Sequence, residues 1–412
     1  MRRELLFISP ALPQPMGNGL SMRAWNVLHA LATEFDVHLL VGSRYFPCRL
    51  EQLGRTQLPV VSRGVIPVDP LRDWLLLRHR LMQRMGLVRG TADWLCMTRS
   101  TEAAVRRFLT GKSISVIHVF RLYMWPAAEL AINALPGACR QLDMDDIESL
   151  TRSRLAWLYG FSGKERKAAQ AGREALFMGE QEERILPECD RVWVCSSLDG
   201  MKLAAKKPKT FVGVVPNTVA PPTVCPPLPR DGPFCLLFIG NMGYFPNRDA
   251  VRFLCNEIVP QIRRLGNRPF RVKVVGRVPV FMPFRGLLPC PEVEFVGAVE
   301  DIAGCYAGAH AVLVPLRAGG GTRIKVIEAF AYRRPVVATA LAVEGLEVRD
   351  GTHALVAETA YTLARQCVNL MNDGQMADSL ATAACRLFES RYHPDVVADA
   401  VRTHTIACAE EK

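Results

Sequence analysis

A run of three glycines between a strand-like and a helix-like segment constrains this chain most. The apolar run Ala311–Pro315 leads into Gly319–Gly321, a helical pattern follows over residues 324–331, and the β-branched run Pro335–Thr339 comes next. This order of strand, loop, helix and strand is typical of parallel α/β sheets, which bind ligands where loops leave the carboxyl ends of their strands. The sequence therefore predicts an α/β fold with a ligand-binding loop after residue 315.

The glycine loop has the chemistry of an anion site. Glycine backbone N–H groups can approach a ligand closely, and a helix N-terminus adds unpaired donors and partial positive charge. Thr322 is the predicted N-cap, Arg323 and Lys325 supply two cations, and Glu328 shares a helical face with Lys325. We expect a diphosphate to bind here. The alternative is a tight turn with solvated cations, in which Glu328 pairs with Lys325.

Residues 234–356 resemble the donor domain of glycosyltransferase family 4, the retaining GT-B enzymes of group 1 type. The motifs that carry the resemblance, in the family's order, are Phe238–Met242 with Pro246 and Asn247, Val274–Arg277, Val296 and Gly297 with Asp301, Val314–Leu316, the glycine loop, Ile327–Ala329, Pro335–Val337 and Val343–Leu346. The resemblance implies a GT-B fold, in which two doubly wound Rossmann-like domains face each other across a cleft. The second domain would hold most of the nucleotide sugar.

The resemblance also implies roles for individual residues. The donor-binding candidates are Gly240, Asn241, Gly276, Arg277, Gly319, Gly320, Gly321, Thr322 and Glu328. Among them Glu328 would hold the nucleotide ribose, and Arg323 and Lys325 would be catalytic charges that balance the leaving diphosphate. The first acid of the family's glutamate pair falls at Gly320, so the sugar contacts depart from the family's pattern.

The first half supplies candidates for the acceptor side of the cleft. Gly17 and Gly19 follow the first predicted strand, and the resemblance places this loop beside the acceptor and the donor phosphates; without the resemblance it reads as a turn. The strand Val116–Phe120 resembles one that bears two histidines in the family. His118 fills the first position and Phe120 the second, so His118 is a catalytic candidate, with a structural role as the alternative.

Four carboxylates crowd residues 143–148 at the end of a predicted strand. The resemblance places Asp145, Asp146 and Glu148 on the acceptor side, where one of them can serve as a base for the acceptor hydroxyl. The alternative is that the cluster caps the helix that follows. The resembled fold needs no obligatory metal, and we expect no cofactor beyond the nucleotide sugar itself.

Short apolar runs and helical patterns alternate through both halves. The predicted strands are 5–8, 37–41, 115–119, 191–195, 211–215, 235–239, 272–275, 293–296, 312–315 and 336–339, and the predicted helices are 21–34, 101–109, 148–186 and the residues from 361 onward. The long helical segment is expected to break near Gly160–Gly163.

Length and proline content predict two domains. A chain of 412 residues exceeds one ordinary core, and seven prolines lie between Pro216 and Pro233, where neither a helix nor a central strand can form. We therefore predict an acceptor-side domain over residues 1–222 and a donor domain over residues 223–390. By the resemblance, a helix over residues 391–412 crosses back to the first domain.

The net charge of +11 lies mainly in the first half, with +9 over residues 1–222 and +2 over the rest. Such asymmetry predicts an anionic partner, such as a membrane surface, a lipid-linked acceptor or an acidic glycan; the alternative is a merely soluble basic surface. No aromatic-basic motif accompanies the charge, which argues against nucleic acid. The basic amphipathic segment Asp73–Leu87, with Arg78, Arg80 and Arg84, either lies in an anionic membrane interface or packs on the domain.

Thirteen cysteines without a Cys-x-x-Cys pair indicate neither zinc nor a disulfide framework, which suits a reducing cytosol. The sequence offers no signal peptide or membrane span, so we expect a cytoplasmic protein, soluble or peripheral on the inner face of the membrane.

We therefore predict transfer of a sugar from a nucleoside diphosphate sugar to an acceptor hydroxyl with retention, in polysaccharide or glycoconjugate synthesis. The acceptor would be a glycan or a lipid-linked molecule. The alternatives are a nucleotide-sugar epimerase or hydrolase, and a non-catalytic relative that binds a polyanion or a partner.

Overall fold

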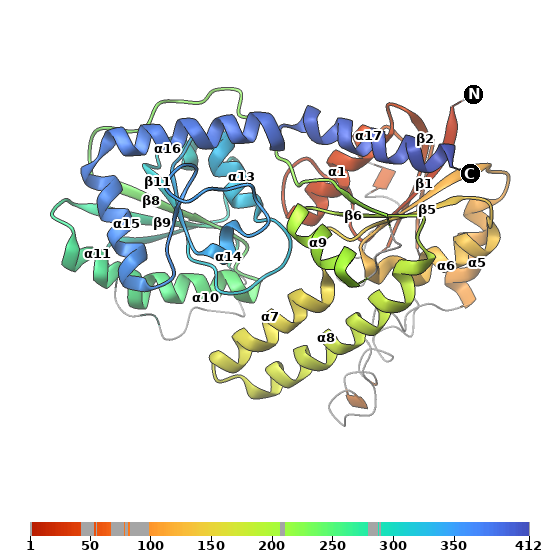
Figure 1. Ribbon diagram of the computed structural model, residues 1–412, viewed down its shortest axis with the longest axis horizontal. Coiled ribbons are helices and arrows are strands. Elements are labelled where there is room, and N and C mark those ends of the chain that lie inside the picture. Colours follow the sequence, from red (N-terminus) through yellow and green to blue (C-terminus); the bar gives the residue numbers. More distant parts are fainter. Residues whose placement is uncertain are drawn as a thin grey trace. The chain divides into compact units, whose positions relative to one another are not determined.

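The computed structural model describes residues 2–42, 53–54, 56–66, 78, 81–82, 99–206, 211–278, 287 and 290–411. The chain divides into two compact units (Figure 1). The first unit comprises Met1–Pro216 and Asp395–Lys412, and the second comprises Asn217–Pro394. The division thus falls inside the proline-rich segment, six residues before the predicted boundary, and the C-terminal helix belongs to the first unit.

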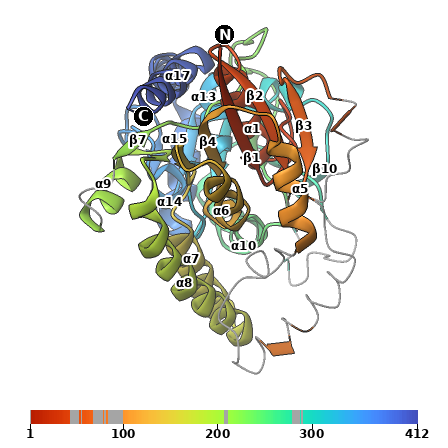
Figure 2. The same ribbon diagram turned by 90° about the vertical axis from the view of Figure 1, so that its right-hand side faces the viewer.

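In the described part of the first unit, seven parallel strands form one sheet in the order β3-β2-β1-β4-β5-β6-β7 (Figure 2). The strands are β1 (Arg3–Ser9), β2 (Phe35–Val41), β3 (Ser62–Val65), β4 (Ile114–Phe120), β5 (Cys139–Asp143), β6 (Arg191–Val194) and β7 (Val212–Val214). The helices are α1 (Gly19–Leu31), α5 (Arg99–Leu109), α6 (Trp125–Ala134), α7 (Glu148–Phe161), α8 (Glu165–Ile185), α9 (Ser197–Lys206) and α17 (Pro394–Glu410). Because the strand order reverses between β1 and β4, the sheet is doubly wound, as predicted.

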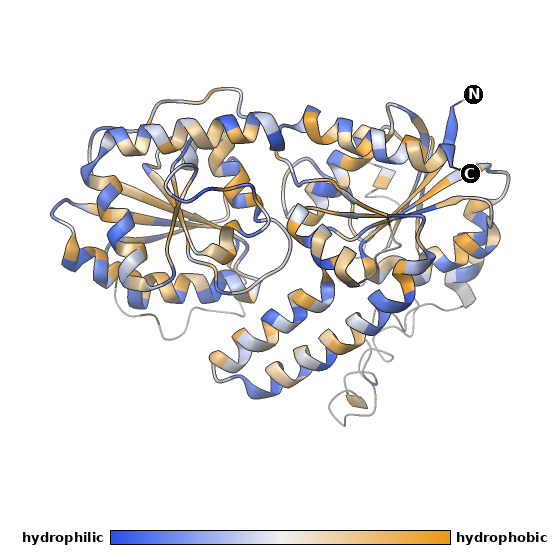
Figure 3. Ribbon diagram, in the orientation of Figure 1, coloured by the Kyte–Doolittle hydropathy of each residue, from blue (hydrophilic) through white to orange (hydrophobic). Residues whose placement is uncertain are grey.

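The core of the first unit lies on both faces of this sheet, because its strands are near-continuous apolar runs (Figure 3). Along β1 the side chains alternate between the two faces. Leu5 and Phe7 pack with α1 and α17, and Leu6 and Ile8 pack with α5 and α6. The helices therefore cover the sheet from both sides.

A disulfide joins Cys139 of β5 to Cys408 of α17. The sequence did not indicate this pair, because the two cysteines lie 269 residues apart and share no motif. The bond attaches the C-terminal helix to the central part of the first sheet.

In the described part of the second unit, six parallel strands form a sheet in the order β10-β9-β8-β11-β12-β13. The strands are β8 (Phe234–Ile239), β9 (Phe270–Val275), β10 (Val293–Gly297), β11 (Ala311–Val314), β12 (Val336–Ala338) and β13 (Leu355–Val356). The helices are α10 (Phe245–Phe253), α11 (Val259–Leu265), α12 (Ala303–Ala307), α13 (Ile324–Ala331), α14 (Ala340–Val343), α15 (Ala360–Asn372) and α16 (Gly374–Leu387). This order reverses between β8 and β11, so the second unit is also Rossmann-like.

The predicted break in the long helical segment is confirmed. Helix α7 ends at Phe161 and α8 begins at Glu165, with Gly163 at a φ of 67° between them. A positive φ is accessible to glycine without steric cost, so the chain reverses there. Among the described residues, no helix combines the length and apolar character needed to cross a membrane.

Candidate functional site

The point where the second sheet reverses its strand order positions the donor candidates. The loops after β8, β9 and β11 leave the carboxyl edge of neighbouring strands, which is where ligands bind in doubly wound sheets. Residues 240–241, 276–277 and 319–323 lie on these three loops. The predicted donor residues therefore come from one edge of the second sheet.

The glycine loop has a backbone that only glycine adopts easily. Gly319 has a φ of 138° and Gly321 a φ of 61°, both in the region that side chains disfavour. Arg323 folds back over this loop, and its guanidinium donates to the carbonyl oxygens of Gly319 at 3.3 Å and Gly320 at 2.9 Å and to that of Gly321. Because Arg323 is buried, the alternative with solvated cations is wrong.

The expected N-cap role of Thr322 is wrong. Helix α13 begins at Ile324 with Arg323 as its N-cap, one residue later than expected. The hydroxyl of Thr322 instead accepts a hydrogen bond at 3.0 Å from the side-chain amide of Asn217, at the start of the second unit. This bond ties the proline-rich segment to the glycine loop.

Lys325 is held by a residue in the first turn of α10. Its ammonium donates to Oδ1 of Asn247 at 2.8 Å and lies 4.5 Å from the ring centre of Phe238. The Asn247 amide in turn donates to the carbonyl of Asn241 at 2.9 Å. A side chain at position 240 would place its Cβ 2.9 Å from the ammonium, so Gly240 makes the room for this contact.

Burial lowers the pKa of Lys325 to about 7. The Glu328 carboxylate partly offsets the effect and the charge of Arg323 adds to it. The ammonium is therefore only partly charged near neutral pH. A bound anion would stabilise its protonated form.

Glu328 is buried and oriented by a residue that the sequence did not single out. The hydroxyl of Tyr306 donates to Oε2 of Glu328 at 2.9 Å, and the Tyr306 ring stacks on Tyr332 with the ring centres 4.5 Å apart. Burial raises the pKa of Glu328 to about 7, against the Tyr306 hydrogen bond and the charge of Lys325, which lower it. Glu328 therefore keeps a fixed orientation near Lys325.

The loops after β8 and β9 approach each other so closely that position 276 has no room for a side chain. Gly276 has a φ of 139°, and a Cβ there would collide with the carbonyl oxygen of Gly240. The amide of Met242 donates to the carbonyl of Arg277 at 3.0 Å. The side chains of Asn241 and Arg277 are exposed, and their donor-binding roles stay predictions.

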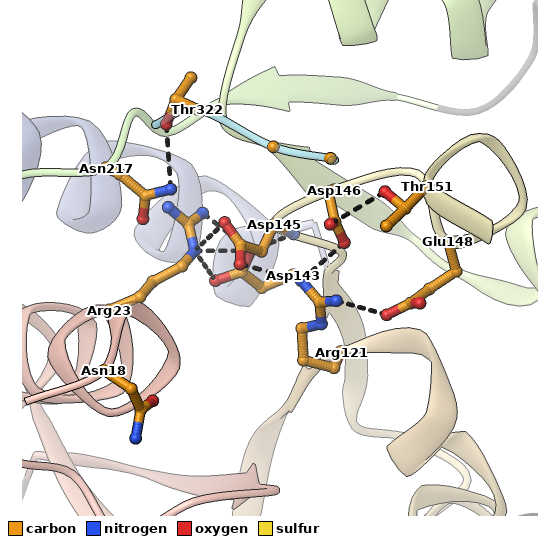
Figure 4. A network of polar contacts seen from close by, with 12 residues as sticks. Asn18, Arg23, Arg121, Asp143, Asp145, Asp146, Glu148, Thr151, Asn217 and Thr322 are labelled. Atoms are coloured by element: carbon orange, nitrogen blue, oxygen red, sulfur yellow. Dashed lines mark hydrogen bonds and ion pairs between the residues drawn. The ribbon is translucent and has the colours of Figure 1, made fainter. Parts of the chain in front are cut away.

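In the first unit, the loop after β1 leads directly into α1. Gly17 has a φ of 127°, Asn18 caps the helix by accepting from the amide of Ser21 at 3.0 Å, and Gly19 is the first helical residue. The next turn carries Arg23, which is buried. Its Nε and Nη2 donate to the Asp143 carboxylate at 2.9 and 2.8 Å (Figure 4).

The remaining carboxylates gather around a second arginine. Arg121, directly after β4, contacts Asp145 at 2.9 Å and Asp146 at 2.7 Å, and also bonds Glu148 (Figure 4). Arg121 and Asp145 have φ values of 76° and 60°, so strained backbone is concentrated here. Burial raises the pKa of Asp146 to about 7, against the charge of Arg121.

These carboxylates do not cap α7 through a side-chain hydrogen bond, but Glu148 lies in its first turn, where the helix dipole favours a negative charge. The N-cap of α7 is Ile147, which provides no side-chain bond. The amide of Ser149 donates instead to Glu182 of α8 at 2.9 Å. The proposed base role for one of Asp145, Asp146 and Glu148 stays a prediction.

The structure contradicts a catalytic role for His118. Its ring is fully buried within β4, with centres 4.7 Å from Phe7 and 5.1 Å from Trp193, and its Nδ1 lies 2.8 Å from the amide nitrogen of Gln141. Burial, together with the charge of Arg23, lowers the pKa of His118 to about 3. The ring is thus neutral and enclosed in the core, which is the structural alternative.

Two further predictions concern a metal site and a membrane contact. Within the residues that the structure describes, no group of three or more His, Cys, Asp or Glu side chains could hold a metal ion. Of the segment Asp73–Leu87, only Arg78, Leu81 and Met82 are described, so the predicted contact through Arg80 and Arg84 lies outside the described residues.

Comparison with known proteins matches part of the second unit to a family. Residues 233–373 match the family model described as "Glycosyl transferases group 1". None of the curated proteins compared with the chain matches it.

Solved structures share the fold over nearly the whole chain. Sucrose-phosphate synthase from Thermosynechococcus elongatus covers 100% of both chains with a TM-score of 0.72 and 15% identity. Anabaena HepE, in a complex with UDP and glucose, covers 98% of this chain and 99% of its own, with a TM-score of 0.62 and 13% identity. A glycosyltransferase from Rickettsia africae covers 99% and 98%, with a TM-score of 0.60 and 12% identity.

At these identities the structural likeness establishes the fold alone, which is GT-B. The family model covers residues 233–373, which contain the glycine loop, Arg323, Lys325 and Glu328. This part of the chain matches the group 1 glycosyltransferases, so the resemblance seen in the sequence is confirmed for the second unit.

Proposed function

We propose that this protein transfers a sugar from a nucleoside diphosphate sugar to an acceptor hydroxyl, with retention at the anomeric carbon. The observation that carries the proposal is the group at the glycine loop formed by buried Arg323 and Glu328 with half-buried Lys325. Two cations and one carboxylate suit a ligand that has a diphosphate at one end and hydroxyls at the other. The presence of UDP in the complex of the similar HepE makes a UDP sugar the first donor to test.

The proposed mechanism is electrostatic. As the bond between the anomeric carbon and the diphosphate oxygen breaks, negative charge grows on the leaving diphosphate. Lys325, fixed by Asn247, and Arg323, fixed by the loop carbonyls, would stabilise that charge without reorganising. The loop N–H groups would add further donors, so we expect no obligatory metal.

On the acceptor side we propose the first unit, with Asp146 as the carboxylate best suited to take a proton. Its raised pKa of about 7 lets it exist as an acid or a base near neutral pH. The acceptor would be a glycan or lipid-linked molecule in polysaccharide or glycoconjugate synthesis. The excess charge of the first half favours an anionic acceptor or a membrane-bound one.

The direct test is a screen of nucleotide sugars by mass spectrometry, followed by NMR of the product. Transfer with retained anomeric configuration would support the proposal. Release of free sugar would indicate a hydrolase and a changed sugar an epimerase. Binding without turnover towards any acceptor would indicate a non-catalytic relative, for which the glycine at position 320 is the motivating observation.

Replacing Glu328 with alanine should weaken donor binding by about 1–3 kcal/mol, the usual loss for a charge-assisted hydrogen bond. Within the described part of the chain, the side chain of Glu328 accepts one hydrogen bond, from Tyr306 to Oε2, which leaves capacity for ribose hydroxyls. Titration calorimetry with UDP-glucose measures the change, and Glu358→Ala on the same unit is the control. Unchanged affinity in Glu328→Ala would remove this residue from the donor site.

The affinity for a nucleotide sugar should be bell-shaped in pH, with its maximum near 7. Protonated Lys325 binds the diphosphate more tightly, so affinity falls as pH rises through its pKa of about 7. Ionised Glu328 accepts ribose hydroxyls better, so affinity also falls as pH drops through its own pKa of about 7. Each limb is shallower than about tenfold per pH unit, because losing either charge weakens donor binding without abolishing it.

Two variants separate the limbs of this profile. Glu328→Gln should lose the acid limb, and Lys325→Met should lose the alkaline limb. Calorimetry between pH 5 and 9 is decisive because both phosphates of a nucleotide sugar are diesters that do not titrate there. A flat profile in the unmodified protein would contradict this account.

A further inference from the structure

The hairpin of α7 and α8 has a buried base and an exposed tip. At its base Ile147, Leu150, Met178 and Ile185 pack into the core of the first unit. Phe161 lies eleven residues beyond Leu150, which is about 17 Å along a helix. The hairpin therefore extends away from the sheet of its own unit (Figures 1 and 2).

The tip, defined as residues 153–173, exposes aromatic side chains. Trp157 is 55% exposed and Phe161 is 61% exposed, and their rings stack with centres 5.4 Å apart. By contrast, Trp125 and Trp193 are fully buried. Two stacked aromatic rings one helical turn apart thus form an apolar surface in water, which is unfavourable unless something covers it.

The tip that carries these rings is basic. It contains Arg154, Lys164, Arg166, Lys167 and Arg173 against a single acid, Glu165, a net charge of +4. Arg166 and Lys167 are exposed, and the ammonium of Lys167 lies 5.8 Å from the ring centre of Tyr159. Exposed aromatic rings on a basic tip match the headgroup region of an anionic bilayer, where Trp is enriched and Lys and Arg meet lipid phosphates.

We propose that the tip of the α7–α8 hairpin docks on an anionic membrane surface, with Trp157 and Phe161 inserted at the headgroup level. The basic residues of the tip supply long-range attraction and the two rings supply the apolar anchor. This inference goes beyond sugar transfer and does not depend on it. It also concerns residues distinct from the segment 73–87, which the sequence had suggested for membrane contact.

The test measures binding of the full-length protein to vesicles of phosphatidylglycerol and phosphatidylcholine in equal parts, and to phosphatidylcholine alone. We expect binding to the anionic vesicles that weakens with added salt, since exposed charges are screened over about 8–10 Å at physiological ionic strength. Arg166→Gln with Lys167→Gln should weaken it about 30-fold, at roughly fivefold for each basic residue near the surface. Trp157→Ser with Phe161→Ser should weaken it at least about tenfold.

Lipid brominated near the headgroup end of its acyl chains tests insertion directly, because bromine quenches tryptophan only at short range. We expect partial quenching in the unmodified protein and its loss in Trp157→Phe, which keeps an aromatic ring and binding. Met201→Ser, which removes a similarly exposed apolar side chain on α9, and Arg264→Gln, on α11, should change neither readout.

Equal vesicle binding by the tip variants, or unchanged quenching in Trp157→Phe, would overturn the proposal. So would a change of oligomeric state in the tip variants, which would assign the surface to a second copy of the chain. UDP-glucose binding is measured on every variant and should be unchanged. If the unmodified protein binds no nucleotide sugar, the proposed function is refuted, but the result on vesicle binding still stands.

Discussion

Replacing Lys325 with methionine should lower kcat for sugar transfer by about 100- to 1,000-fold while changing the donor KM much less, when both are measured near pH 7. Methionine keeps the apolar stem over Phe238 and removes only the charge. Since the charge on the diphosphate is larger in the transition state than in the ground state, the ammonium contributes most when the bond breaks. Arg323→Met should behave in the same way.

Steady-state kinetics with saturating acceptor separates the two effects. Arg264→Ala, which removes an exposed cation of the second unit, serves as the control and should leave both constants unchanged. Lys325→Arg is not expected to restore activity, because the tight space beside Gly240 and Asn247 accommodates an ammonium and not a planar guanidinium. If Lys325→Met raises KM but keeps a normal kcat, the ammonium binds the ground state and the transition state equally well. That result would contradict the proposed role of Lys325 in catalysis.

The sequence predicted those parts of the donor site that depend on local chemistry. The order of strand, glycine loop and helix around residues 311–331 was confirmed because apolar periodicity and glycine content act over a few residues. The same holds for the break between α7 and α8 at Gly163. We predicted the N-cap of α13 one residue too early, because the Thr322 hydroxyl bonds the side-chain amide of Asn217, which is 105 residues away.

The residues that orient the site could not be predicted because their contacts are distant in sequence. Tyr306 lies 22 residues before Glu328, and Asn247 lies 78 residues before Lys325. The prediction of a catalytic role for His118 failed for a different reason. An apolar strand buried on both faces gives no signal of which side chains reach the carboxyl edge, and His118 lies inside the sheet.

The arginine and carboxylate network of the first unit raises the question of what its burial costs. Arg23 and Asp143 have side chains that are 2% and 0% exposed, and hydrogen bonds from both Nε and Nη2 of Arg23 join them. A further bond runs from Arg23 Nη1 to the carbonyl of Val215 at 3.0 Å, so α1 is tied to the ends of β5 and β7. The pair therefore fixes the loop of Gly17 and Gly19 relative to the sheet of its own unit.

Replacing Asp143 with asparagine should destabilise the first unit by about 3–5 kcal/mol, because the Arg23 guanidinium would stay buried without its counter-charge. Urea unfolding followed by tryptophan fluorescence measures this loss for the first unit alone, since all six tryptophans lie between residues 25 and 193. Glu102→Gln breaks an exposed pair with Arg106 and should cost at most about 1 kcal/mol.

A double variant shows whether the cost comes from the unpaired charge. Arg23→Met with Asp143→Leu removes both charges and keeps similar volumes, so it should recover most of the stability lost in Asp143→Asn. Donor binding by the second unit should persist in this variant, whereas transfer to the acceptor should fall because the loop of Gly17 and Gly19 loses its tie to β5. If Asp143→Asn is no less stable than Glu102→Gln, water reaches the pair and Arg23 is not held by Asp143 in the way the contacts indicate.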